Sequence, residues 1–320
     1  MVPDDRELRS TGSDRALLTD RFPGQAAVDE LVVSRQSEHL DSEDLMATHA
    51  LGILFWLAVA FTGLVVVLAV VANLLPLPKP DFQNYAAINA SPSIHHLLGT
   101  DELGRDLLSR LIFGARVSLV VGFGAVFIGM AVGGTLGLIS GVRGGAIDIG
   151  LNAASFVLLA FPAIVAVIAV VAFWKASLIH ITIIIGVGTI PILFRVIRAS
   201  SLAFANRDFV IAARTLGATR NRIVFREILP NVVPAAVSFG LITVAGVIVL
   251  EGSLAFLGLS VPLPTPSWGN MIAEGVSNGV LQVNPYVLLW PALAMFLLLL
   301  SINLIGDRLR QKFDIREGLL

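Results

Sequence analysis

One segment of the 320-residue sequence has the glycine spacing of a phosphate-binding loop. Residues Gly99–Asp106 read Gly-Thr-Asp-Glu-Leu-Gly-Arg-Asp. A nucleotide-binding loop with this spacing next requires a lysine that reaches the phosphates and a hydroxyl residue that ligates magnesium. Arg105 and Asp106 stand at those positions, and the complete motif occurs nowhere else in the chain. The sequence therefore predicts a protein that does not hydrolyse ATP by itself.

Metal binding and acid–base catalysis have little support from the sequence. The pair His95–His96 lies close to Asp101 and Glu102, but adjacent histidines point in different directions and no spaced ligand set accompanies them. His180 stands alone in an apolar stretch, which favours a hydrogen-bonded helix residue. The chain has no cysteine, so disulfides and thiolate ligands are excluded. We expect no catalytic residue, no metal and no cofactor in this chain.

Glu251 is a carboxylate near the end of a long apolar stretch. A charged side chain inside a membrane is costly, which makes it a functional candidate. The residues that follow it, Gly252 and Ser253, indicate a position close to the membrane surface, where that cost falls. Two interpretations stay open: a structural role at an outer gate, or a direct role in transport.

A second polar segment, residues 207–231, combines small residues with arginines. Ala212, Ala213 and Gly217 are small, and Ala213 and Gly217 are four residues apart on one helix face. A short helix with a bare face and charged flanks can dock into a groove on another protein. Leu229–Pro230 is expected to end this element, because proline disfavours helix in the residue before it. The alternative is a solvated basic loop, so the pattern alone indicates a cytosolic partner and nothing more specific.

The composition requires a membrane around these residues. The chain is 56% hydrophobic and 14% charged, with a mean hydropathy of +0.84, whereas soluble domains carry about 25% charged residues. A water-soluble fold of this length could not cover so much apolar surface. The net charge of −1 gives no reason to expect nucleic acid as a partner. The sequence predicts an all-α polytopic membrane protein surrounded by lipid.

Six apolar stretches reach the length of about 20 residues that a bilayer span needs. They cover residues 50–75, 117–142, two within 149–194 that we divide at 174–176, 231–256 and 286–306. The predicted organisation is an acidic cytosolic tail (1–49, with an amphipathic piece at 26–33), a first transmembrane helix (50–76), an external loop and surface helix (77–116), a five-helix core (117–306) with a cytosolic loop at 199–230, and a C-terminal tail (307–320).

Lysine and arginine in the loops predict the orientation. Residues 195–226 hold seven arginines and residues 308–316 hold four basic residues, whereas residues 257–285 hold none. Both termini and the loop after the fourth span are therefore expected in the cytosol. Three arginines between 105 and 116 disagree with this orientation, and we expect the acidic residues between 101 and 106 to offset them.

The second span carries a regular row of glycines. Gly129, Gly133, Gly137 and Gly141 follow one another at four-residue spacing. This spacing forms one flat helix face that a partner backbone can approach closely. The row predicts a packing seam, within the bundle or against a second subunit. The alternative is the general enrichment of glycine in membrane helices.

Several separated segments resemble one known family. The EAA signature of ABC-importer permeases, which forms the helix that couples to the ATPase, is matched by Ala212, Ala213, Gly217, Ile228, Leu229 and Pro230. Ile211 stands where that family usually has glutamate. His96–Leu119 resembles the segment before the second span in the C-type subunit of dipeptide, oligopeptide and nickel importers. Leu254–Ser260 and Pro264–Asn270, which includes Trp268, resemble its last external loop, and Gly306–Arg310 resembles its C-terminal end.

The resemblance covers about residues 50–315 and implies a type I ABC importer permease in the bacterial inner membrane. It implies a homologous B-type permease that shares the pathway, an extracytoplasmic substrate-binding protein, and separate or fused ATPase subunits that bind Mg-ATP. Residues 207–224 would contact the ATPase, and Glu251 and Trp268 would belong to the external gate or loop.

Peptides are the expected substrate because they dominate that family, with nickel or another small solute as the alternative. A secondary transporter would carry charges within its spans and interrupted helices. A membrane-bound enzyme would need the catalytic residues that this sequence lacks.

Overall fold

The computed structural model describes residues 52–174, 177–277 and 282–317, and in this part of the chain the regular elements are all helices. The chain divides into Met1–Leu54, of which only three residues are described, and Phe55–Leu320, which holds the packed helices. The predicted acidic tail and its amphipathic piece lie outside the described residues.

Several helices follow one another with short connections, whereas residues 75–106 and 257–267 form longer ones. In chain order they are Gly52–Leu74, α3 (Leu107–Gly129), α4 (Thr135–Arg143), α5 (Gly145–Ala160), α6 (Ala163–Phe173), α7 (Leu178–Ala205), α8 (Asp208–Thr215), α9 (Arg220–Arg222), α10 (Leu229–Phe256), α11 (Trp268–Ser277) and α12 (Tyr286–Glu317). Two π-helical turns, η3 (Met130–Gly134) and η4 (Ile223–Ile228), join α3 to α4 and α9 to α10, and two short 3-10 turns, η1 (Ala72–Leu74) and η2 (Tyr85–Ala87), lie before α3.

Five of these helices are long and apolar enough to cross a membrane: Gly52–Leu74, Leu107–Arg143, Leu178–Ala205, Arg220–Phe256 and Tyr286–Gln311. The pair α5 and α6 passes the same test only as one bent span, with an angle of 78°. Counting this pair as one span gives the six that the sequence predicts.

The bend between α5 and α6 corrects the expected third span, which the sequence treats as one uninterrupted helix. α5 ends at Ala160, Phe161 is extended, and Pro162 precedes α6. Proline cannot continue the hydrogen-bond ladder of a helix and pushes the residue before it into the extended region. The Phe161–Pro162 step is therefore sufficient to break the span.

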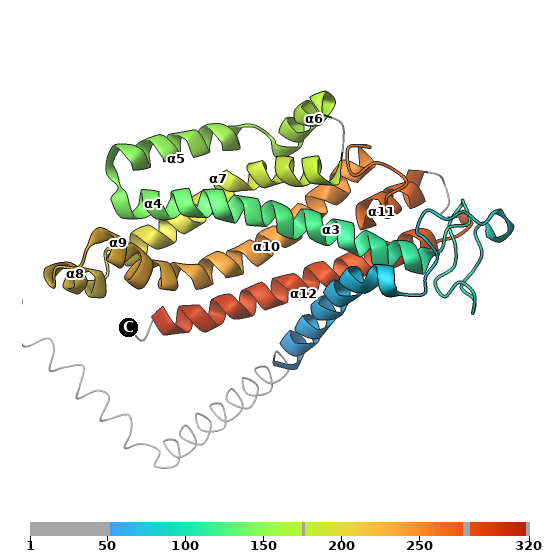
Figure 1. Cartoon of the computed structure of the whole chain (residues 1–320), viewed down its shortest axis with the longest axis horizontal. Helices are drawn as coiled ribbons and strands as arrows, with labels where there is room; N and C mark the ends of the chain where they lie inside the picture. Colours follow the sequence, from blue (N-terminus) through green and yellow to red (C-terminus); the bar gives the residue numbers. More distant parts are fainter. Residues whose placement is uncertain (1–51, 175–176, 278–281, 318–320) are drawn as a thin grey trace, which may run out of the picture. The chain divides into compact units, whose positions relative to one another are not determined.

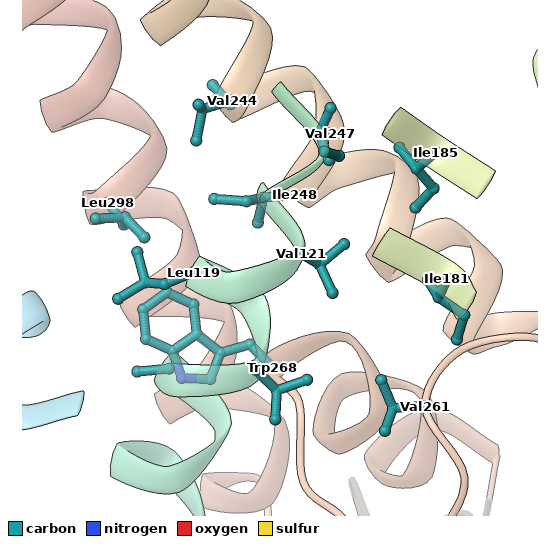
Figure 2. Packing of buried hydrophobic residues seen from close by; sticks show 14 of the residues in the cluster. Leu119, Val121, Ile181, Ile185, Val244, Val247, Ile248, Val261, Trp268 and Leu298 are labelled. Atoms are coloured by element: carbon teal, nitrogen blue, oxygen red, sulfur yellow. The ribbon is translucent and has the colours of Figure 1, made fainter. Parts of the chain in front are cut away.

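The core lies where α3, α7, α10 and α12 pack together, with α3 and α4 following α7 along its length (Figure 1). Val121, Ile248 and Leu298 are fully buried and come from three of these helices. Figure 2 shows the Trp268 ring of α11 beside Leu119, in the same cluster. Close packing of apolar side chains therefore stabilises the helix bundle.

The glycine row faces α7 of the same chain. A Cβ atom added to Gly133 would lie 2.4 Å from the carbonyl oxygen of Ile190, and one added to Gly137 would lie 2.6 Å from that of Phe194. Gly129 meets Thr189 in the same way. Gly141 meets Ser201 and the backbone of Arg198. The sequence left open whether the glycine row packs within the helix bundle or against a second subunit. In the structure it packs against α7, within the bundle.

We expect Gly137→Leu to destabilise the protein, because α4 and α7 must separate to admit the side chain. Overpacking of this kind costs about 1–3 kcal/mol. The measurement is the midpoint of thermal unfolding of the purified protein in detergent. Gly188→Leu in α7 is the matched control, because a Cβ there meets no atom within 4 Å. Equal midpoints for the two variants would contradict the seam.

Candidate functional site

The predicted functional residues lie at two opposite ends of the helix bundle (Figure 1). We call them the α8 end, which holds α8 and α9, and the α11 end, which holds α11 and the segment before α3. Each end has a distinct chemistry, so each is described separately.

At the α8 end, α8 is fixed to the bundle by one face. Val210 is fully buried and belongs to an apolar cluster with Phe204, Ile223 and Ile228. Asp208 in the first turn and Arg214 in the last turn complement the helix dipole. α8 is therefore a short, anchored helix rather than a solvated loop.

Gly217 ends α8 and does not share a face with Ala213. Its N–H donates to the carbonyl of Arg214 at 3.0 Å, and the N–H of Ala218 donates to the carbonyl of Ala213 at 3.0 Å. This bonding pattern requires a left-handed residue just past the helix, and Gly217 has φ +79°. Ala213 is half-buried against the apolar cluster. The expectation that Ala213 and Gly217 share one helix face is therefore wrong, because the helix ends at Thr215.

The exposed side of the α8 end is apolar at several positions. Leu216 is 88% exposed, Phe225 is 65% exposed and Ile211 is 52% exposed. Ala212 is also exposed, between the arginines of this segment. Clustered exposed apolar side chains are typical of protein–protein or membrane interaction sites. The sequence pattern identified Ile211 and Ala212 but missed Leu216 and Phe225. Phe225 ends an apolar run of three residues, so the sequence carries no signal of its exposure.

Pro230 does not end the helix as the sequence predicted. Residues Arg220–Phe256 form one continuous helix, in which Leu229 is half-buried and Pro230 is exposed. The turn η4 before the proline is π-helical, and the Leu229 N–H donates to the carbonyl of Val224, five residues back. A wider turn accommodates a ring that would otherwise clash with a carbonyl of the preceding turn.

At the α11 end, Glu251 is fully buried. Its Oε1 accepts hydrogen bonds from the hydroxyls of Ser260 and, at 2.8 Å, Ser267. Its Oε2 has no partner among the described residues. The segment between α10 and α11 covers the carboxylate, so this chain itself shields Glu251 from solvent and lipid.

Trp268, the first residue of α11, connects that helix to α3. Its indole Nε1 donates to the carbonyl of Leu111 at 2.9 Å, and its backbone N–H donates to the hydroxyl of Ser118 at 3.3 Å. The ring lies 3.2 Å from where a Cβ of Gly114 would stand, so this close approach needs glycine. Trp268 is thus a buried packing residue at the start of α11.

The arginines that disagreed with the expected orientation are used inside the molecule. Arg105 binds Asp101 at 2.6 Å and Glu274 at 3.2 Å. The fully buried Arg110 binds Glu274 at 2.6 Å. Arg116 donates to backbone carbonyls at the end of the helix Gly52–Leu74. Glu274 was missed because its partners are more than 160 residues away in the sequence.

The loop Gly99–Asp106, whose glycine spacing is that of a phosphate-binding loop, caps the N-terminus of α3 in the structure. Asp106 caps α3 by accepting a hydrogen bond from the N–H of Ser109 at 2.9 Å, and its other oxygen binds His96 at 3.0 Å. Gly99 and Gly104 adopt positive φ. Among the described residues, no group of three or more His, Asp or Glu side chains could hold a metal ion.

One further ion pair, which the sequence did not indicate, lies towards the α8 end. Arg198 of α7 makes two bonds to the carboxylate of Asp148 in α5, at 2.5 and 2.6 Å, and Ser140 of α4 binds the same carboxylate. Arg195, one turn away, lies over the ring of Phe156. These contacts fix the otherwise exposed α5 to the bundle.

Comparison with known proteins places this architecture in a class. Over residues 133–317 the chain matches the family described as "Binding-protein-dependent transport system inner membrane component". It is 38% identical over 241 residues to the "Glutathione transport system permease protein GsiD" of Pectobacterium atrosepticum, covering 75% of this chain and 79% of that protein. It is 36% identical over 265 residues to the "Dipeptide transport system permease protein DppC" of Alkalihalophilus pseudofirmus, covering 80% and 85%.

The fold also matches a solved structure. The MetNI methionine ABC transporter in an inward-facing conformation has a TM-score of 0.53 and 21% identity, covering 65% of this chain and 96% of that chain. The architecture is that of an ABC importer permease. By its sequence, the chain belongs to the inner-membrane components of binding-protein-dependent transport systems.

Proposed function

We propose that this chain is the C-type permease subunit of an ATP-driven importer of di- or oligopeptides. Family membership supports the permease role, and the names of the dipeptide and glutathione relatives support a peptide substrate. The chain would form the pathway with a homologous B-type permease. ATPase subunits would bind Mg-ATP, and an extracytoplasmic binding protein would deliver the peptide.

The single observation that carries the coupling role is the exposed apolar surface of an anchored α8. Leu216 and Ile211 are available to an ATPase, while Val210 ties the helix to the bundle. Only two residues separate α7 from α8, and the helix from Arg220 runs directly into α10. Movement of α8 is therefore passed to α7 and to α10, which both pack against α3.

The orientation follows from the same assignment. The α8 end, rich in arginine, would face the cytosol together with both termini. The α11 end would face outward and receive the binding protein. The arginines of that end are bound in ion pairs and in hydrogen bonds to backbone carbonyls. Their presence on the outer side therefore does not count against the orientation that the lysines and arginines of the other loops predict.

Uptake in a deletion strain tests the proposed function. We expect loss of the gene to abolish uptake of labelled dipeptide and tripeptide, and the intact gene to restore it, with nickel uptake unchanged. In proteoliposomes holding the full complex and binding protein, uptake should require ATP. Loss of nickel uptake alone would contradict the peptide assignment. Uptake that needs no ATP and collapses with a protonophore would contradict the importer.

A further inference from the structure

Glu251 is a buried carboxylate that the proposed coupling steps do not use. Its Oε1 accepts from Ser260 and Ser267, which lie near the two ends of the connection between α10 and α11. A single oxygen on α10 therefore binds both ends of this connection. We call residues 257–277, the connection together with α11, the α11 cap.

Hydrogen bonds continue from Glu251 into α11 itself. The Ser267 hydroxyl, which donates to Glu251, also accepts from the N–H of Asn270 at 3.0 Å and so caps α11. The Asn270 side chain donates to the carbonyl of Val261 at 2.7 Å. The carboxylate thus fixes the connection and the first turn of α11 in one arrangement.

The opposite side of the α11 cap is bound to α3 and the residues before it. Glu274 accepts from Arg105 and Arg110, and Trp268 donates to Leu111 and Ser118. Lifting the cap would break these four bonds as well as the two to Glu251, and it would leave Arg110 without its closest carboxylate and Glu251 without its two hydroxyl donors. Buried polar groups without partners are costly, so the docked position is strongly favoured.

We propose that Glu251 is a positioning residue whose carboxylate holds the α11 cap on α10, so that the cap moves as one body with the outer ends of α3, α10 and α12. The pathway then opens between subunits and not by lifting of this cap. The inference rests on the proposed function only for its transport consequence, because the docking itself is a property of this chain.

Cysteine labelling tests the docking. The chain has no cysteine, so Ala273→Cys introduces one thiol at a buried position of α11. With an impermeant maleimide, we expect Glu251→Ala to raise the labelling rate about tenfold or more, because two hydroxyl bonds are lost. Ser260→Ala combined with Ser267→Ala should have the same effect. The control is Ser253→Ala, because Ser253 is an exposed serine two residues from Glu251.

Labelling at the wild-type rate in both Glu251→Ala and the double serine variant would overturn the positioning role. A fast rate in Glu251→Ala with a wild-type rate in the double serine variant would overturn it too, since Glu251 would then act through its charge. Neither result depends on peptide import, so failure of the proposed function remains distinguishable.

A disulfide tests the movement, including the case in which Glu251 variants fail to fold. A Cβ on Gly275 of α11 would lie 3.2 Å from the Cβ of Leu288 in α12, near the separation of about 3.5–4.5 Å that disulfides span. In the complete complex carrying Gly275→Cys and Leu288→Cys, we expect the same ATP-dependent uptake rate before and after oxidation. Loss of uptake on oxidation that a reductant restores would show that the cap must lift, and would overturn the inference.

Discussion

We expect Leu216→Asp to abolish binding-protein-stimulated ATP hydrolysis and uptake together, while the chain still inserts and folds. Leu216 is almost fully exposed, so the substitution costs this chain little by itself. In a docked complex the same side chain would be buried against the ATPase, where an unpaired charge is strongly unfavourable. Loss of one central contact of this kind weakens an interface by about 2–4 kcal/mol. Ile211→Asp should act in the same direction with a smaller effect, because that side chain is less exposed.

The measurement is the stimulated ATPase rate of the reconstituted complex, with co-purification of the ATPase subunits read in parallel. Leu216→Met, which keeps an apolar side chain of similar volume, is the matched control and should retain activity. Full stimulated activity in both Leu216→Asp and Ile211→Asp would mean that the ATPase docks elsewhere.

Glu274→Leu should cause the largest loss of stability at the α11 end. Arg110 is fully buried, and Glu274 is its closest carboxylate. Removing one partner of a buried ion pair costs about 3–5 kcal/mol, because the other charge stays buried. The midpoint of thermal unfolding of the purified complex measures this. Combining Glu274→Leu with Arg110→Leu should recover part of the loss, since an apolar pair replaces an isolated charge.

Asp81→Leu is the control for this prediction, because Asp81 is an exposed carboxylate in the segment before α3. We expect its unfolding midpoint to stay close to that of the unmodified protein. A Glu274→Leu variant that unfolds at the same temperature as the Asp81→Leu variant would contradict this prediction and would show that Asp101, 3.6 Å from Arg110, is a sufficient counter-charge.

The spans and the glycine row could be predicted because both follow from local spacing. Apolar length predicts a bilayer span, and glycines four residues apart lie on one face of any helix. The partner of that face, α7, could not be chosen from the sequence, because a seam within the bundle and a seam between subunits need the same small residues. Gly133 and Gly137 required the three-dimensional arrangement to show whose backbone they meet.

Prolines and glycines at helix ends were harder to interpret. Pro162 breaks a span and Pro230 does not, although each interrupts an apolar stretch. The difference is the π-helical turn before Pro230, which the sequence does not mark. Gly217 has the spacing of a docking face but the φ of a helix end. Glycine occurs both on helix faces that pack closely and at helix ends with positive φ, so spacing alone cannot distinguish these two roles.

The ionic cluster at the α11 end had a signal that could have been used. Glu274 is the single carboxylate between residues 257 and 285, and the three arginines on the same expected side were matched only with acidic residues close to them in the sequence. Matching the two would have predicted a contact between the last external loop and the start of the second span. The hydroxyl partners of Glu251 had no comparable signal, because serine is common in polar loops.

The helix Arg220–Phe256 is 37 residues long, which corresponds to about 55 Å at a rise of 1.5 Å per residue. The hydrocarbon layer of a bilayer is about 30 Å thick. Even when tilted, this rod extends well past the lipid tails, and the part that carries η4 and the arginines would stand clear of the headgroups. An ATPase would therefore bind the permease at a distance from the membrane surface. The same helix carries Glu251 near its other end, so a movement imposed on it outside the bilayer reaches the α11 cap through one continuous helix.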